Sequence, residues 1–184
     1  MFRPTHSQKG EGENGGETFL GKPFFSFILG LAAFEIMANN REKKGRATPV
    51  ISQSFASSSL GQGDIWKVYL NASDPDGDMK YIVCTIDQPG IGTSPVSFTR
   101  IKEENRQQLS GYIYLNTAGV DGLNFSSLTL TVQIQDRAGN FSDPVSFSLQ
   151  FRMGVRQETP PTNTFQEIEL GPIMITLQVT SGGG

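Results

Sequence analysis

The chain has 184 residues and a formal net charge of −3, and only 18% of its residues are charged. It carries no basic stripe, which excludes the electrostatic footprint of a nucleic-acid-binding protein. The chain has a single cysteine, Cys84, so it cannot form an intramolecular disulfide. Its single histidine, His6, lies in a polar tail, which excludes most kinds of zinc site and of histidine-based catalytic site.

Residues 1–23 are polar and rich in glycine and glutamate. They cannot bury enough apolar surface to offset the entropy of ordering, so we expect a disordered leader. Residues 24–38 follow, and they begin with eleven uncharged, mostly apolar residues. This run is too short to span a bilayer but has the length of the apolar region of a signal peptide.

We therefore expect residues 24–38 to form a short apolar helix that acts as a signal or signal anchor, with a cleavage point before Asn39. The long polar leader and the nearby Glu35 depart from a simple signal peptide. Two alternatives stay open, a helix on the membrane surface and a helix packed on the domain. Residues 39–48 are basic and read as a solvated linker.

The next region, residues 49–152, repeatedly alternates apolar and polar residues. The clearest case is residues 128–134, where Leu, Leu, Val and Ile alternate with Thr and Gln, followed by a turn at 136–140 and a second alternating stretch at 145–151. A period of two predicts an antiparallel hairpin with one face in a core. Five further strands are predicted before it, at residues 49–55, 64–72, 79–87, 95–101 and 108–116.

Each predicted strand has apolar residues that identify its face. In the strand predicted at residues 64–72, we expect Trp66, Val68, Leu70 and Ala72 to share the core face. The strand predicted at residues 95–101 carries Val96 and Phe98. The other expected core residues are Ile82, Cys84, Ile86, Leu109, Ile113 and Leu115. The fold class predicted from these patterns is all-β, an immunoglobulin-like antiparallel β-sandwich of about seven strands.

Two phrases of the sequence, Leu70–Asp78 (LNASDPDGD) and Val132–Asn140 (VQIQDRAGN), carry a resemblance to a known class. Residues 49–152 resemble bacterial immunoglobulin-like and cadherin-like repeats of secreted and surface proteins. The resemblance implies a β-sandwich whose second-to-third and sixth-to-seventh strand turns are these two phrases. The sequence departs from antibody domains, because it has no disulfide pair, no tryptophan on the third strand and no tyrosine corner.

Residues 153–184 form a proline-containing linker and one more β segment. Pro160-Pro161 gives a stiff spacer, and residues 165–180 alternate apolar side chains at Ile173, Ile175, Leu177 and Val179. We expect this segment to dock on its own domain. The alternative is a donor strand for another chain, by strand addition.

Asp74, Asp76 and Asp78 occupy alternate positions of one turn and form the candidate metal site, with Asp136 approaching from the second turn. Clustered carboxylates repel one another, and calcium accepts six to eight such oxygen ligands. The spacing is not that of an EF-hand, because glycine falls at the fourth loop position and threonine at the twelfth. Ordinary turn chemistry of Asp, Pro and Gly explains the same residues without a metal.

No catalytic constellation or phosphate-binding loop is present, so we expect no enzyme activity. The sequence predicts a non-catalytic extracytoplasmic module with a structural, adhesive or binding role in the bacterial envelope, whether periplasmic, envelope-attached or secreted. Its expected partners are a protein or a glycan, and membrane contact is expected only through residues 24–38. The alternatives are an envelope-assembly subunit that donates its C-terminal strand, and a small carbohydrate-binding domain with an aromatic face of Trp66, Tyr112 and Tyr114.

Overall fold

The computed structural model describes residues 47–120, 122–123 and 126–179. The predicted leader and apolar helix, residues 1–38, lie outside the described residues. Within the described part, no helix is long and apolar enough to cross a membrane. The elements there are β1 (Val50–Ala56), β2 (Ser59–Leu60), β3 (Ile65–Ser73), β4 (Met79–Gln88), β5 (Gly92–Thr93), β6 (Ser97–Arg100), a 3₁₀ turn (Glu103–Asn105), β7 (Gln108–Asn116), β8 (Ser127–Asp136), β9 (Val145–Phe151) and β10 (Glu169–Pro172).

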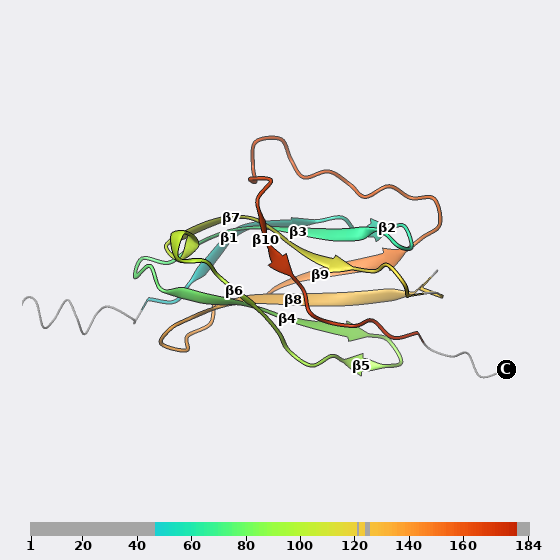
Figure 1. The fold of residues 1–184 in the computed structure, drawn as a ribbon, viewed down its shortest axis with the longest axis horizontal. Coiled ribbons are helices and arrows are strands. Elements are labelled where there is room, and N and C mark those ends of the chain that lie inside the picture. The colour runs from blue at the N-terminus through green and yellow to red at the C-terminus, as the bar shows by residue number, and fades with distance from the viewer. Residues whose placement is uncertain (1–46, 121, 124–125, 180–184) are drawn as a thin grey trace, which may run out of the picture. The chain divides into compact units, whose positions relative to one another are not determined.

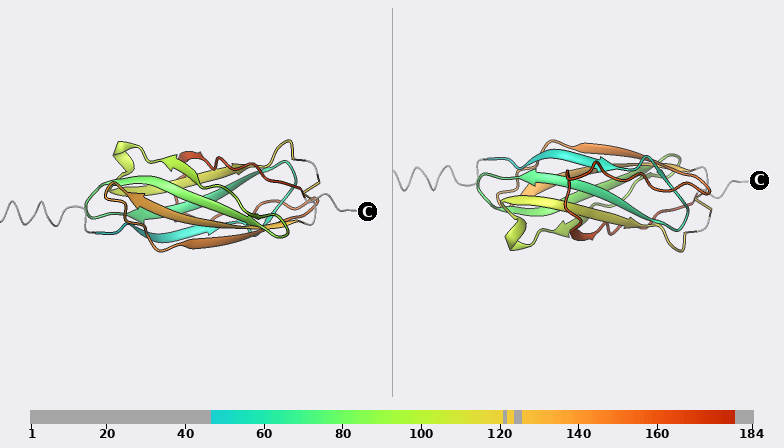
Figure 2. Two further views of the ribbon diagram at one scale, coloured as in Figure 1. Left: turned by 90° about the horizontal axis from the view of Figure 1, so that it is seen from below. Right: turned by 90° about the horizontal axis from the view of Figure 1, so that it is seen from above.

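The strands form two sheets, and the all-β prediction is confirmed (Figure 1). One sheet has the order β1-β3-β7-β10, and the other has the order β2-β9-β8-β4-β5 with β6 also paired to β4. The long strands of the two sheets run in nearly the same direction, and the turns gather at their two ends (Figure 2).

The prediction of an antiparallel sandwich of about seven strands is confirmed only in part, because each sheet also contains a parallel pair. The structure adds two-residue strands β2 and β5 and pairs two strands in parallel, β2 with β9 and β10 with β7. Strands of two residues are too short to show an alternating pattern. Parallel neighbours depend on how distant segments meet, which alternation within one segment does not encode.

The faces predicted for the long strands are confirmed. Trp66, Val68 and Leu70 are fully buried, and Leu130 and Ile134 of β8 are equally inaccessible. Burial of each large aliphatic side chain contributes about 1.5–3 kcal/mol. The Trp66 indole N–H donates to the carbonyl of Ser57 over 2.9 Å, so its one polar atom is satisfied inside the core.

Around β6 the apolar side chains face solvent and the polar side chains face the interior. Val96 and Phe98 are 48% and 54% exposed, whereas Ser97 and Thr99 are buried. The reason is a polar requirement: the Ser97 hydroxyl accepts from the Met174 N–H over 2.8 Å, and the Thr99 hydroxyl donates to the Pro172 carbonyl over 2.7 Å. These inward hydroxyls serve the backbone of the C-terminal segment.

That segment, residues 153–179, is called the C-terminal arm below. It leaves β9, passes over the side of β3 and β7, and returns as β10 beside β7 (Figure 1). Ile173 and Leu177 are each 4% exposed and belong to the same hydrophobic core as the other strands. The expected β segment at 165–180 is thus a four-residue strand followed by a non-strand stretch, and Val179 at its end is 43% exposed.

Glycine at one position of β7 lets the arm pass. A Cβ atom added to Gly111 would overlap the carbonyl oxygen of Ile168 and crowd the side chain of Leu170. The Tyr112 N–H donates to this same Ile168 carbonyl over 2.8 Å, which fixes the approach of the arm to β7. The close contact therefore depends on the missing side chain of Gly111.

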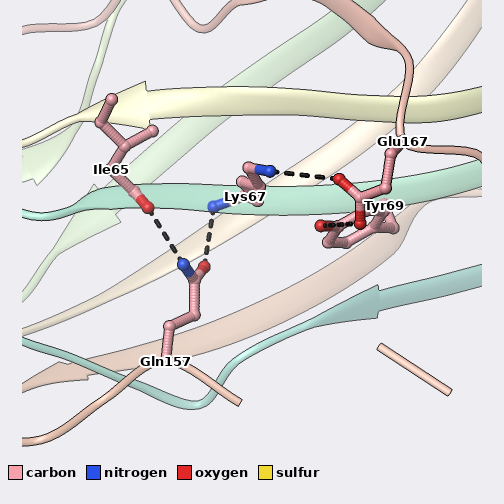
Figure 3. Close-up of polar contacts among 5 residues, drawn as sticks. All are labelled: Ile65, Lys67, Tyr69, Gln157 and Glu167. Atoms are coloured by element: carbon pink, nitrogen blue, oxygen red, sulfur yellow. Dashed lines mark hydrogen bonds and ion pairs between the residues drawn. The ribbon is translucent and has the colours of Figure 1, made fainter. Parts of the chain in front are cut away.

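Polar side chains of the arm also cover the outer part of β3 (Figure 3). Strand β1 ends opposite Val68, so the edge of β3 before that point has no neighbouring strand on this side. The Gln157 amide takes the place of one: its oxygen accepts from the Lys67 N–H over 2.9 Å, and its nitrogen donates to the Ile65 carbonyl over 3.1 Å. One side chain thus satisfies two strand-edge groups.

Candidate functional site

The two turns that carry the candidate acidic residues meet at one end of the sandwich. The turn at residues 74–78 joins β3 to β4, and the turn after β8 leads into β9. Met79 pairs with Asp136, and the Arg137 N–H donates to the Asp78 carbonyl over 3.1 Å. The fold therefore brings Asp136 to the turn that holds Asp74, Asp76 and Asp78. These four residues are called the acidic cluster below.

Asp136 is 1% exposed and closes its own turn. Its Oδ1 accepts from the Asn140 backbone N–H over 2.8 Å, and its Oδ2 accepts from the Asn140 side-chain amide over 2.7 Å. Both carboxylate oxygens thus have donors. This is local turn chemistry of the kind that Asp and Asn supply without a metal.

Asp74 is equally buried, at 1% exposed. Its Oδ1 accepts from the Asp76 N–H over 3.0 Å. Its Oδ2, like Oδ1 of Asp78, is shielded from solvent, and the described residues offer these oxygens no partner beyond the hydrogen bond between the Asp74 and Asp78 carboxyl groups. Two ion pairs occur in the described part of the chain, and neither involves Asp74, Asp78 or Asp136.

The environment of Asp78 raises the pKa of its carboxyl group to about 6. Burial is the largest cause, followed by a hydrogen bond to Asp74 and by the negative charges of Asp74, Asp136 and Asp76. Each of these causes favours the neutral acid over the carboxylate. The four carboxyl groups therefore interact electrostatically across the two turns.

Asp76 links the cluster to the chain that enters the sandwich, because its Oδ2 accepts from the Ala47 N–H over 3.1 Å. Asp143, which lies between β8 and β9, is exposed. As the side chains stand, no three acidic, histidine or cysteine residues in the described ranges are grouped tightly enough to hold a metal ion.

The other candidates from the sequence occupy positions in the core. Cys84 is 1% exposed, and burial raises the pKa of its thiol to about 12, which keeps it protonated at neutral pH. Trp66 is fully buried, so the aromatic face of Trp66, Tyr112 and Tyr114 is not formed. This alternative loses its aromatic face because Trp66 and the two tyrosines lie on opposite faces of the first sheet.

A second group of polar contacts, which the sequence did not indicate, lies between the arm and β3 (Figure 3). Glu167 accepts from the Tyr69 hydroxyl over 2.8 Å and from the Lys67 ammonium over 3.2 Å. The hydrogen bond from Tyr69 is the main reason why the pKa of Glu167 is lowered. Burial, followed by the bond to Glu167, raises the pKa of Tyr69.

These contacts line a crevice of about 570 Å³ between β3 and the arm. Its aromatic wall is already packed, since Tyr69 lies 5.5 Å from Tyr112 and 5.6 Å from Phe165 between ring centres, and the Lys67 ammonium lies 4.2 Å from the Tyr112 ring. The partners are about ninety to a hundred residues apart in the chain, for example 98 for Tyr69 and Glu167. No pattern within one segment indicates such contacts.

No family model matches the sequence, and no curated protein is similar to it. The resemblance to immunoglobulin-like and cadherin-like repeats therefore stays a prediction from the two turn phrases.

Proposed function

We propose that this protein is a non-catalytic, immunoglobulin-like module that acts outside the cytoplasm, in a structural, adhesive or binding role at a bacterial envelope. The observation that carries the proposal is the strand order. Strands β1, β3 and β7 form one sheet, and β4, β8 and β9 form the other. This division of first, second and fifth against third, sixth and seventh long strands is that of immunoglobulin-like sandwiches.

The first strand adds further support. The chain of β1 leaves its sheet after Ala56, and β2 then pairs in parallel with β9 of the opposite sheet. The position beside β7 is filled by β10 from the C-terminal arm, which is a departure from the usual order. We infer an immunoglobulin-like sandwich with an added C-terminal strand.

A binding or structural role is favoured over catalysis by the chemistry of the described residues. The thiol of Cys84 is buried, and the carboxylates at the end of the sandwich lie in turns rather than in a cleft. Turns displayed on a rigid sandwich are the usual place for recognition by such domains. A protein or a glycan of the envelope is the partner class that we propose.

Of the two alternatives, neither gains support. Strand donation to another chain is disfavoured, because Ile173 and Leu177 of the arm already lie in this chain's own core and would have to leave it. A carbohydrate-binding face is disfavoured because Trp66, its expected tryptophan, is fully buried and cannot contact a sugar.

Cell fractionation tests the export part of the proposal. The full chain is expressed in a bacterium, the fractions are separated, and the N-terminus of the protein is determined by mass spectrometry. We expect the protein in the envelope or outside the cell, either cut near Asn39 or held by residues 24–38. Uncut protein confined to the cytosol would contradict the proposal.

A matched pair of variants separates export from general effects on expression. Leu29→Arg places a charge inside the apolar run and is expected to retain the protein in the cytosol. Glu11→Arg changes a charge in the polar leader and is expected to leave the fractionation unchanged.

A further inference from the structure

The outer face of the second sheet carries neighbouring apolar side chains where β6, β4 and β8 lie side by side (Figure 1). Phe98 of β6 and Val96 just before it are 54% and 48% exposed, and Phe98 lies opposite Val83 of β4. The Tyr81 ring packs edge-on against Phe98, with 5.6 Å between the ring centres. Contiguous exposed apolar surface of this kind marks an interaction site, which single scattered residues do not.

The side chains beside these apolar residues are polar but uncharged. On β4 and β8, the outward residues at the same level are Thr85, Thr131 and Gln133, and they alternate with buried core residues. We call the seven residues of this surface the outer band: Tyr81, Val83, Thr85, Val96, Phe98, Thr131 and Gln133. The centre of a protein interface is depleted of charge in the same way, because a charge buried there would lose its hydration.

Charged side chains of opposite sign flank the outer band at its two ends. At one end, the Lys80 ammonium lies 5.0 Å from the centre of the Tyr81 ring, and Arg100 pairs with Tyr81 across the strands. At the other end, Asp87 closes the outward row of β4, and its Oδ1 accepts from the Thr93 hydroxyl over 3.0 Å. A strand rises about 3.3 Å per residue, so the two charged ends are about 20 Å apart.

These end charges have no opposite charge of their own within the described part of the chain. The two ion pairs found there join Lys67 to Glu167 and Arg106 to Glu103. Lys80, Arg100 and Asp87 take part in neither. The face therefore has a positive end, an uncharged and partly apolar middle, and a negative end.

We propose that a second copy of this chain packs on the outer band, face to face and with its strands reversed, as a symmetric dimer. The two-fold axis lies between the two faces and crosses β4 near the level of Cys84. It places Phe98 of each copy against Val96 of the other. It also places Asp87 of each copy opposite Lys80 and Arg100 of the other. A two-fold interface requires a surface that is complementary to itself in this way.

The presence of both signs favours a second copy over a partner of one sign. An acidic glycan or an anionic lipid surface that met the two cations would also meet Asp87, and like charges brought together at an interface are unfavourable. A copy of the same chain supplies a cation for Asp87 and a carboxylate for Arg100 at once. This inference adds an interaction surface to the proposed function, and it does not depend on where the protein is located in the cell.

Sedimentation equilibrium of the full chain tests the inference. The mass is measured between about 1 and 300 µM, and we expect an equilibrium between monomer and dimer. Phe98→Asp places a charge in the middle of the outer band and is expected to raise the dissociation constant of the dimer about tenfold or more. Val50→Asp is the matched control, because Val50 is 53% exposed on β1 of the other sheet. It is expected to leave the dissociation constant unchanged.

An exchange of charges tests the reversed arrangement of the two copies. Arg100→Asp and Asp87→Arg each bring like charges together in the dimer of that variant, so each is expected to dimerise more weakly than the unchanged chain. An equimolar mixture of the two variants is expected to restore the dimer, because each end then meets the opposite charge. Circular dichroism checks that the variants keep their fold.

Three results would each overturn the proposal. The first is a monomer at every concentration of the unchanged chain. The second is association that Phe98→Asp leaves as strong as before, which would place the contact elsewhere. The third is a mixture of Arg100→Asp and Asp87→Arg that is no more dimeric than the separate variants. If Phe98→Asp does not fold, the mass of the unchanged chain and the mixture decide.

Discussion

Strand β8 and the C-terminal arm carry the same kind of alternating apolar pattern, yet they form different structures. In β8 the apolar residues from Leu128 to Ile134 are buried, and the strand is ten residues long between β4 and β9. In the arm, Ile173 and Leu177 are equally well buried, but the strand is four residues long and ends at Pro172.

The difference lies in the neighbours that the backbone finds. Strand β8 has a strand on each side, so its N–H and C=O groups are paired by two ladders. Beyond Pro172 the Ile173 N–H still donates to the Tyr114 carbonyl, but the arm then meets side chains. The hydroxyl of Ser97 accepts from the Met174 N–H, and the amide of Gln88 bonds to both backbone groups of Gln178. An alternating pattern therefore predicts which side chains are buried, and the available partners decide how long the strand is.

The largest expected effect comes from the core of β8. Leu130→Ala is expected to lower the free energy of unfolding by about 2–5 kcal/mol, because it removes a fully buried side chain and leaves a cavity. Urea denaturation measures it. Thr131→Ala, which changes the neighbouring outward side chain, is the control and is expected to cost within about 0.5 kcal/mol. Similar losses in the two variants would contradict the assigned faces.

A smaller effect is expected where the arm crosses β7. Gly111→Ala places a methyl group against the Ile168 carbonyl, and we expect a cost of about 1–3 kcal/mol as the arm shifts away. Limited proteolysis is expected to cut residues 165–179 faster while β8 stays protected. Gln108→Ala, an exposed change on the same strand, is the control. An arm as resistant as that of the unchanged protein would show that it does not lie on Gly111.

The acidic cluster is expected to make stability depend on pH. Folding raises the pKa of Asp78 from 3.8 to about 6, so the fold favours the protonated form. This contribution to stability is fully present below pH 3.8 and is lost as the pH rises through about 6. The melting temperature of Asp78→Asn is therefore expected to fall less between pH 5 and pH 7.5 than that of the unchanged chain. Equal slopes would contradict the assigned environment of Asp78.

The smallest effect is expected at the polar contacts of the arm. Glu167→Gln is expected to cost under about 1 kcal/mol, because the Glu167 side chain is 61% exposed. Since folding lowers the pKa of Glu167, its contribution is present above pH 4.5 and is lost as the pH falls. A double-mutant cycle with Tyr69→Phe measures the coupling. A coupling of zero at pH 7 would show that the hydrogen bond adds nothing.

The sequence predicted the sandwich well where the signal is repeated along a strand. The burial of Trp66, Val68 and Leu70, and of Leu128 to Ile134, follows from period-two alternation. The inward hydroxyls of Ser97 and Thr99 could not be predicted, because they serve a backbone seventy residues or more away, 77 for Ser97 and Met174. The same holds for Gln157, whose side chain substitutes for a missing strand.

For the candidate site, the sequence indicated which turns meet but not how the carboxylates are satisfied. The alternate spacing of Asp74, Asp76 and Asp78 and the strand order suffice to bring Asp136 near them. That Asn140 satisfies Asp136 while Asp74 and Asp78 share a hydrogen bond depends on side-chain rotamers and turn geometry. These are set by packing at the end of the sandwich, which the spacing alone does not encode.

Residue-resolved hydrogen exchange by NMR tests the comparison between β8 and the arm most directly. We expect slow exchange throughout the interior of β8, and in the arm at Ile173, Met174 and Gln178, whose N–H groups have acceptors. Ile175 and Leu177 have no such acceptor among the described residues and are expected to exchange faster, although Leu177 is buried. Equal protection of Leu177 and Val132 would contradict the account, because it would require a continuous strand through the arm.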